Sequence, residues 1–140
     1  MFKQLTPAVA VSPQIEVADV ATAAAQGFVC IVNNRPDGES PDQPAGGAIR
    51  AAAEAAGLRY VAIPVDARGF SQPMVAAMAD ALGAGKTLAF CRSGTRSTNL
   101  WSLASASQGG SIAEITATAA AAGYDVSGLA GAMAQLGGKA

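Results

Sequence analysis

The sequence has no histidine and only two cysteines in its 140 residues. Without histidine, Ser-His-Asp and Cys-His catalysis are excluded, and no His-containing zinc site can form. The two cysteines, Cys30 and Cys91, are too few and too far apart in sequence to indicate a disulfide framework. This cysteine usage is typical of a reducing compartment, and we therefore expect the protein to be cytoplasmic.

An excess of charge and a long apolar run are also missing. The formal net charge is −1 and the pI is about 5.2, so there is no basic stripe for nucleic acid and no polybasic patch for a membrane surface. No segment approaches the ~18 consecutive apolar residues of a membrane span. Pro7 and Pro13 interrupt the apolar stretch near the N-terminus, which leaves too little for a secretory signal. We expect neither a nucleic-acid nor a membrane partner.

Aromatic residues are scarce as well, at 5%, and much of the 51% apolar fraction is alanine. Alanine is a strong helix former that adds little core volume, so we expect abundant helix packed closely on a modest sheet. The length falls in the commonest single-domain range, which predicts one domain over residues 1–140.

Short apolar runs rich in β-branched residues alternate with helical patterns along the chain. The strands are expected at 8–11, 28–32, 58–65 and 86–90, and the helices at 17–26, 45–57, 74–82, 96–106, 111–122 and 126–136. This alternation predicts an α/β fold with a central, mostly parallel sheet of four to five strands flanked by helices. The polar connections 33–44 and 66–73 are long enough to indicate functional loops.

The strand at 86–90 leads directly into Cys91-Arg92-Ser93-Gly94-Thr95-Arg96, which precedes a helix. Ligands of open parallel sheets bind at the carboxyl ends of strands, where this loop lies. Gly94 permits unusual dihedral angles, and the backbone N–H groups of such a turn can converge at the helix N-terminus. Arg92 and Arg96 add forked cationic donors that suit oxyanions. We therefore expect an anion-binding loop whose substrate contacts come from Arg92, Ser93, Gly94, Thr95 and Ser97.

Cys91 is the candidate nucleophile of this loop. Convergent donors and a helix N-terminus keep a cysteine thiol ionised without any histidine, and the hydroxyls of Ser97 and Thr98 could steady the thiolate as it leaves an intermediate. A lone cysteine at the end of a strand is more often a small core residue, but six polar or turn-forming residues here have no packing purpose. Cys30, inside an apolar strand, is expected to be such a core residue.

Three segments together resemble one bacterial family: Val32 to Glu39, Ile63-Pro64-Val65, and Phe90 to Ser97. The family is the phosphatase-like domain of the beta-lactamase hydrolase-like proteins, which is also described in places as a sulfurtransferase. The similarity covers about residues 3 to 110. It implies the fold of dual-specificity phosphatases, with Cys91 as nucleophile and Arg96 as the arginine that clamps the phosphate.

Two features depart from the tyrosine phosphatase pattern. Phe90 stands where those enzymes usually have histidine, and the loop from cysteine to arginine is one residue shorter than theirs. The shorter loop resembles that of rhodaneses, and a tighter ring with fewer backbone donors suits a single sulfur atom or a smaller anion better than an enclosed phosphoryl group, although the two arginines could compensate. The substrate is therefore either a phosphorylated molecule, whether phosphoprotein or small phosphoester, or a sulfur donor to a Cys91 persulfide. A catalytically silent anion-binding module is the remaining alternative.

A phosphatase also needs an acid that protonates the departing alcohol. Asp66 opens the 66–73 loop, at the place where the resemblance puts this acid, although it could equally be a turn or cap residue. Asp37 and Glu39 are weaker candidates. Arg35 could hold the substrate or brace the cysteine loop. No metal or organic cofactor is implied, because the acidic residues show no ligand spacing.

Overall fold

The computed structural model describes residues 1–140, which form five β-strands, six α-helices and one 3₁₀-helix. In chain order they are β1 (Lys3–Thr6), β2 (Val9–Ser12), α1 (Val17–Ala25), β3 (Cys30–Asn33), α2 (Gly46–Ala55), β4 (Arg59–Ala62), α3 (Gln72–Leu82), β5 (Thr87–Phe90), α4 (Thr95–Ser107), α5 (Ile112–Ala121), η1 (Ser127–Leu129) and α6 (Ala130–Gln135).

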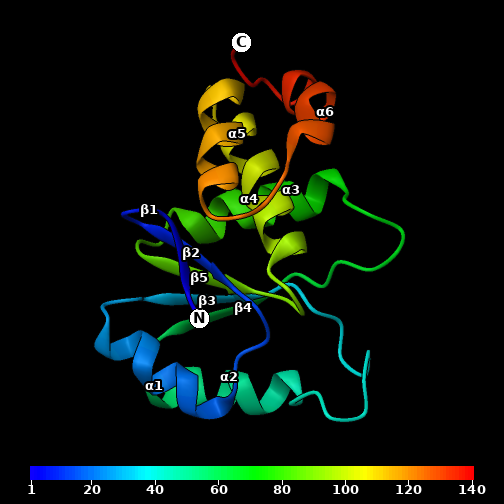
Figure 1. The fold of residues 1–140 in the computed structure, drawn as a ribbon. Helices are drawn as coiled ribbons and strands as arrows, with labels where there is room; N and C mark the ends of the chain where they lie inside the picture. The colour runs from blue at the N-terminus through cyan, green and yellow to red at the C-terminus, as the bar shows by residue number, and fades with distance from the viewer.

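The strands form one sheet in the order β1-β2-β5-β3-β4. β2, β5, β3 and β4 are parallel to their neighbours, whereas β1 runs antiparallel to β2 at one edge. Helices α1 and α2 cover one face of the sheet, and α3 to α6 lie on the other (Figure 1). The α/β fold with a mostly parallel sheet is thus as the sequence predicts.

The core lies on both faces of this sheet. Its larger part, under α3 to α6, includes Val11, Val32, Ala89 and Leu100, and the smaller part, under α1 and α2, includes Ile31. Alternate residues of each strand face opposite sides, so a strand buried on both faces reads as a continuous apolar run. β5 is such a strand, because all four of its residues are fully buried between β2 and β3.

Several boundaries differ from the sequence prediction. Strand β1 was not predicted, because Lys3-Gln4-Leu5-Thr6 is short and contains only one apolar residue, as an edge strand can. The predicted strand 58–65 is only Arg59–Ala62, since Pro64 has no N–H to donate to a ladder. The predicted helix 126–136 is divided into η1 and α6. No helix has both the length and the apolar character needed to cross a membrane.

Candidate active site

Cys91 follows the central strand of the sheet, at its carboxyl end. Its backbone N–H donates to the Ser12 carbonyl at 3.3 Å, and the Phe90 carbonyl accepts from Asn34 at 2.8 Å. The last residues of β2, β5 and β3 are therefore tied together around the start of the loop. Cys91 is 0% exposed, so the loop and its neighbours cover the sulfur in this conformation.

The loop turns from strand to helix at Gly94, as the sequence predicts. Gly94 has a left-handed φ of 92° and precedes Thr95, the first residue of α4. Its backbone N–H donates to the Cys91 Sγ at 3.1 Å. An N–H directed at the sulfur stabilises negative charge on it.

Four further backbone N–H groups of the loop donate to no acceptor in the protein. They belong to Arg92, Ser93, Arg96 and Ser97. Unpaired N–H groups are normal at the first turn of a helix, where they carry the positive end of the helix dipole. Unpaired donors of this kind at the start of a helix are typical of oxyanion sites.

The Arg96 guanidinium is held by the loop that follows β3. Glu39 accepts from Nη1 at 2.7 Å and from Nη2 at 2.9 Å, and the Val65 carbonyl accepts from Nη1 at 2.8 Å. These bonds use both hydrogens of Nη1 and one of Nη2. The Nε–H and the second Nη2–H remain, and they lie on one edge of the guanidinium, which is the fork that binds two oxygens of an anion.

The ion pair between Arg96 and Glu39 strongly favours the charged form of both side chains. The hydrogen bond from Arg96 lowers the pKa of Glu39 to about 2, with a further contribution from Arg35. The hydrogen bond to Glu39 is the main cause that raises the pKa of Arg96, and the proximity of Cys91 adds to it. Glu39 is therefore ionised at neutral pH, which does not suit the role of a proton donor.

Arg35 lies behind this pair and braces it. Its side chain is only 4% exposed. Nε donates to Glu39 at 2.9 Å, and Nη1 donates to the Gln14 side chain at 3.1 Å. Gln14 in turn donates its backbone N–H to the Arg92 carbonyl at 3.2 Å. This geometry favours the bracing role for Arg35 over direct substrate contact.

The hydroxyls of Ser97 and Thr98 are engaged away from the sulfur. Ser97 donates to the Asn34 side chain at 2.8 Å, and Thr98 donates to the Gly94 carbonyl at 2.8 Å. Each hydroxyl has a single hydrogen, so neither can donate to the thiolate in this arrangement, contrary to the expectation from the sequence. They fix the start of α4 to Asn34, which follows β3, and to Gly94 of the loop instead.

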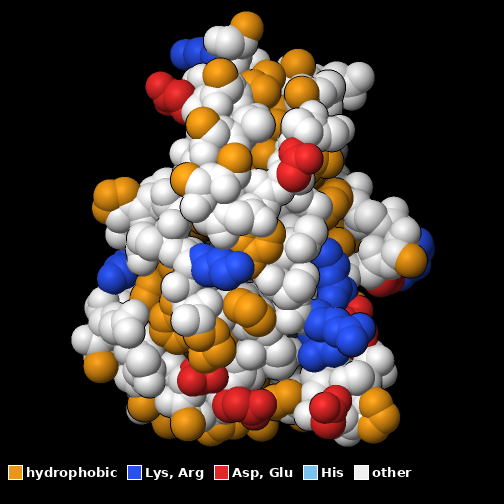
Figure 2. Space-filling view, viewed as in Figure 1, with side chains coloured by type: hydrophobic (Ala, Val, Ile, Leu, Met, Phe, Trp, Pro, Cys, Tyr) orange, Lys and Arg blue, Asp and Glu red, His pale blue; other side chains and the backbone are white.

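Ser93, Thr95 and Arg92 are exposed at the surface of the loop. Ser93 donates its hydroxyl to Thr95 at 3.0 Å. Arg92 lines a polar cleft of about 260 Å³ together with Gln14 and Arg35. Figure 2 shows Lys and Arg side chains gathered on the side of the molecule where Figure 1 places the start of α4.

The structure does not bring Asp66 or Asp37 to the sulfur as ready proton donors. Asp66 is 41% exposed and forms an ion pair of 2.8 Å with Arg68, whose hydrogen bonds lower the pKa of Asp66. Asp37 accepts the backbone N–H of Gly46 at 2.8 Å, at the start of α2. Asp66 would have to leave Arg68 and gain a proton before it could serve as an acid.

Cys30 lies at the opposite end of the sheet from Cys91. It is opposite Thr87 in the ladder between β3 and β5. Cys91 is four residues further on, or about 13 Å along the strand. A disulfide needs Cα atoms within ~7 Å, so the two cysteines cannot form a bridge in this fold. Burial raises the pKa of the Cys30 thiol, which keeps it neutral and unreactive.

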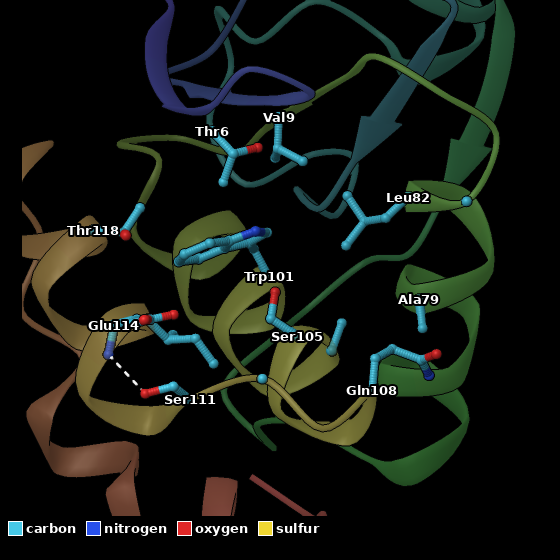
Figure 3. Close-up of a pocket in the computed structure, with 14 residues that line it drawn as sticks. Thr6, Val9, Ala79, Leu82, Trp101, Ser105, Gln108, Ser111, Glu114 and Thr118 are labelled. Atoms are coloured by element: carbon cyan, nitrogen blue, oxygen red, sulfur yellow. Dashed lines mark hydrogen bonds between the residues drawn. The ribbon is translucent and has the colours of Figure 1, made fainter. Parts of the chain in front are cut away.

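The largest cavity, about 580 Å³, is remote from the loop. It lies between the β1–β2 edge of the sheet and helices α3, α4 and α5, and Trp101, Leu82 and Glu114 are among its lining residues (Figure 3). No residue of the cysteine loop lines it. The chemistry of the Cys91 loop is therefore separate from this cavity.

Sequence reasoning missed three residues that hold the site. Asn34 is fully buried and links Ser97 to the Ile63 carbonyl. Gln14 and Tyr124 each contact the loop backbone, at Arg92 and at Ser93. Only Asn34 gave a signal in the sequence, because an amide directly after a buried strand is unusual.

Comparison with known proteins identifies relatives of the chain. Residues 1–108 match the family described as "Beta-lactamase hydrolase-like protein, phosphatase-like domain". A beta-lactamase hydrolase-like protein of Agrobacterium fabrum is 39% identical over 107 residues, which are 71% of this chain and 23% of that protein. One from Xylella fastidiosa is 38% identical over 96 residues, 67% of this chain and 22% of that protein. The chain thus matches about a quarter of the length of these relatives.

Solved structures share the fold. A candidate phosphatase from Neisseria meningitidis is 32% identical, with a TM-score of 0.79 over 95% of this chain and 96% of that one. The dual-specificity phosphatase DUSP15 is 15% identical, with a TM-score of 0.67 over 97% of this chain and 86% of that one. The fold is that of the dual-specificity and tyrosine phosphatases, as the resemblance implies.

Proposed function

Since the chain belongs to the phosphatase-like domain family of the beta-lactamase hydrolase-like proteins, we propose that it is a cysteine-dependent phosphatase that forms a thiophosphate intermediate on Cys91. The observation that carries this proposal is the set of unused donors around the sulfur. In the loop that begins at Cys91, four backbone N–H groups and one edge of the Arg96 guanidinium donate to no acceptor in the protein. That set suits the equatorial oxygens of a phosphoryl group during transfer.

In the first step the Cys91 thiolate attacks phosphorus. The S–P bond forms as the ester P–O bond breaks, and the leaving oxygen takes up a proton. In the second step water attacks phosphorus and the S–P bond breaks, which releases phosphate and restores the thiolate. Arg96 and the free N–H groups stabilise the oxygens in both steps. Because the thiol must stay reduced, we infer a cytoplasmic location.

Asp66 is our candidate for the acid of the first step. It lies in the loop between β4 and α3. The same loop contains Gly69, which has a φ of 86°. In the observed conformation Arg68 holds Asp66 as a carboxylate. The proposal therefore requires that the loop moves on substrate binding, so that Asp66 exchanges Arg68 for the leaving-group oxygen.

The substrate is a phosphorylated molecule that reaches Cys91 from the side of Arg92. Arg92 is exposed and lines a polar cleft beside the loop with Ser40 and Gln43. A hydroxyl and an amide can bind polar groups of a substrate that extend from the phosphate. Both phosphoproteins and small phosphoesters fit this description.

A second candidate function is sulfur transfer through a Cys91 persulfide. Two observations favour it: the six-residue Cys91–Arg96 loop is one residue shorter than that of phosphatases, and no carboxylic acid is poised at the sulfur. The thiolate would attack the outer sulfur of thiosulfate, the S–S bond would break, and sulfite would leave with the electron pair. An acceptor thiolate would then take the sulfur. Neither step needs a proton donor.

The two functions can be separated in one experiment. The protein is assayed for phosphate release from an aryl phosphate and an alkyl phosphate, and for sulfite release from thiosulfate with a thiol acceptor. Variants Cys91→Ser, Asp66→Asn and the control Asp80→Asn are compared with the wild type. Asp80 also pairs with an arginine, at 3.0 Å from Arg59, but Arg59 lies beside Cys30 at the end of the sheet opposite to Cys91. General acid catalysis contributes ~10²–10⁴-fold, so Asp66→Asn should slow the alkyl ester far more than the aryl ester.

Each outcome is decisive. Phosphate release that requires Cys91 supports the phosphatase, and selective slowing of the alkyl ester supports Asp66 as its acid. Sulfite release, a Cys91 adduct one sulfur heavier and no phosphate release would favour sulfur transfer. No turnover in either assay, with phosphate still bound, would favour an anion-binding module.

A further inference from the structure

Tyr124 contacts the cysteine loop from a part of the chain that the family match does not include. The match ends at residue 108, whereas Tyr124 follows α5. Its hydroxyl donates to the Ser93 carbonyl at 2.9 Å, and the residue is only 9% exposed. The C-terminal helices therefore reach the loop through one hydrogen bond.

The end of α5 fixes the position of Tyr124. Gly123 has a left-handed φ of 96° and donates its N–H to the Ala120 carbonyl at 3.0 Å. Tyr124 donates its N–H to the Ala119 carbonyl at 2.9 Å. This pair of bonds is the Schellman motif, which ends a helix in a defined direction. The Lys3 ammonium also lies 4.8 Å from the centre of the Tyr124 ring.

The Tyr124 bond determines how one peptide unit of the loop is oriented. The Ser93 carbonyl and the Gly94 N–H belong to the same trans peptide plane and point in opposite directions. On one side the carbonyl accepts from Tyr124, and on the other the N–H donates to the Cys91 Sγ at 3.1 Å. Rotation of this plane would turn the carbonyl oxygen toward the sulfur and toward a bound anion.

Gly94 makes such a rotation possible, because glycine adopts many backbone conformations at little steric cost. Gly94 also permits the close approach of Tyr124. A Cβ at this position would overlap the Tyr124 hydroxyl and lie 3.0 Å from Cζ. The residue that lets the tyrosine approach is thus also the residue whose peptide needs to be held.

We propose that Tyr124 is a positioning residue for Cys91, and that it holds the Ser93–Gly94 peptide with its N–H toward the sulfur. The proposal rests on the proposed function only in taking the Cys91 loop as the active site. It applies equally to phosphoryl and to sulfur transfer, because both need a stabilised thiolate and an anion pocket free of carbonyl oxygens.

The test compares Tyr124→Phe with the control Tyr60→Phe. Each variant removes one tyrosine hydroxyl that makes a 2.9 Å hydrogen bond, but Tyr60 bonds to Asn33 rather than to the loop. Three quantities are measured: the NMR resonance of the Gly94 amide, the dissociation constant for inorganic phosphate, and the rate constants of turnover. Thermal unfolding shows that each variant is folded.

In Tyr124→Phe we expect the Gly94 amide resonance to move and phosphate binding and kcat to fall roughly 3- to 10-fold, the value of one neutral hydrogen bond. Tyr60→Phe should leave all three unchanged. A folded Tyr124→Phe with wild-type Gly94 resonance and phosphate affinity would overturn the proposal. If no protein turned over any substrate, the proposed function would fail, while the amide and phosphate measurements would still decide the role of Tyr124.

A measurement on the wild type covers the case in which Tyr124→Phe does not fold. A held Gly94 N–H should exchange with solvent more slowly than the N–H groups of Arg92 and Ser93, which have no acceptor. Equal exchange rates for the three amides would overturn the proposal.

Discussion

Glu39 is predicted to be the main electrostatic support of Arg96, and Glu39→Gln tests this directly. Glutamine keeps the size of the side chain and one oxygen, but it loses the charge and the second acceptor. Arg96 donates to both carboxylate oxygens of Glu39, and Arg35 donates to one of them. The variant therefore leaves two guanidinium groups facing a neutral amide whose NH₂ group cannot accept from them.

The size of the effect follows from the pKa of Glu39, which falls from the ordinary 4.5 to about 2. Each pKa unit corresponds to about 1.4 kcal/mol, which sets an upper limit of about 3.5 kcal/mol at neutral pH. The Glu39 side chain is 29% exposed, and solvent screening reduces the contribution to roughly 1–2 kcal/mol. A similar loss of support for Arg96 in the transition state would lower kcat/KM by roughly 5- to 30-fold.

The lowered pKa of Glu39 also determines how its contribution to stability changes with pH. Because the folded-state pKa is lowered, the stabilisation is fully present above about pH 4.5 and is lost as the pH falls toward about 2. Urea unfolding at neutral pH should therefore show Glu39→Gln to be less stable than the wild type, and the difference should narrow from about pH 5 to about pH 3.

The matched control is Glu54→Gln. Its pair with Arg50 is 63% and 60% exposed and should contribute no more than about 0.5 kcal/mol. Equal stability of the two variants at neutral pH would refute the reasoning, as would a difference between Glu39→Gln and the wild type that does not change with pH.

Three further predictions concern the loop and the core. Arg96→Lys keeps the charge but loses the fork, so turnover should fall by roughly 10²-fold or more, while Cys30→Ala should retain wild-type kcat. Mild oxidation should yield no Cys30–Cys91 disulfide, which peptide mapping without reductant checks; a bridged peptide would contradict the register of β3 and β5. Leu100→Ala removes a fully buried side chain of α4 and should lower the free energy of unfolding in urea by about 2–5 kcal/mol. A smaller loss would mean that the surrounding side chains relax into the cavity.

The parts of the fold that the sequence predicts correctly depend on local patterns. The β-branched run at 28–32 and the apolar run before Cys91 both form strands of the sheet centre. Gly94 has the left-handed conformation that its place between strand and helix requires. Each of these features depends on the backbone preference of one residue or on the burial of one strand. The residues next to it in the sequence are therefore enough to predict it.

The contacts that complete the site are of a different kind. Arg96 and Glu39 are 57 residues apart, and Tyr124 and Ser93 are 31 apart. In the sequence Glu39 stands in a polar loop and Tyr124 between two helical patterns, and neither place indicates its partner. Pairings at such separation depend on the packing of whole elements, which a single sequence does not encode in any local pattern. The edge strand β1 was missed for the same reason, because only its pairing with β2 makes it a strand.

The state of the acidic residues limits how the proposed phosphatase can work. Glu39 is ionised down to about pH 2 because it supports Arg96, and Arg68 holds Asp66 as a carboxylate. Without movement of the 66–73 loop, the enzyme can expel only leaving groups that need no proton. The rate would then depend steeply on the pKa of the leaving group, and Asp66→Asn would change nothing. With movement, the dependence in the wild type is shallow and Asp66→Asn makes it steep. A series of aryl and alkyl phosphates assayed with the wild type and with Asp66→Asn distinguishes these cases. If the protein instead transfers sulfur from thiosulfate at a rate that Asp66→Asn leaves unchanged, no proton donor is needed, which would explain why Asp66 is held by Arg68.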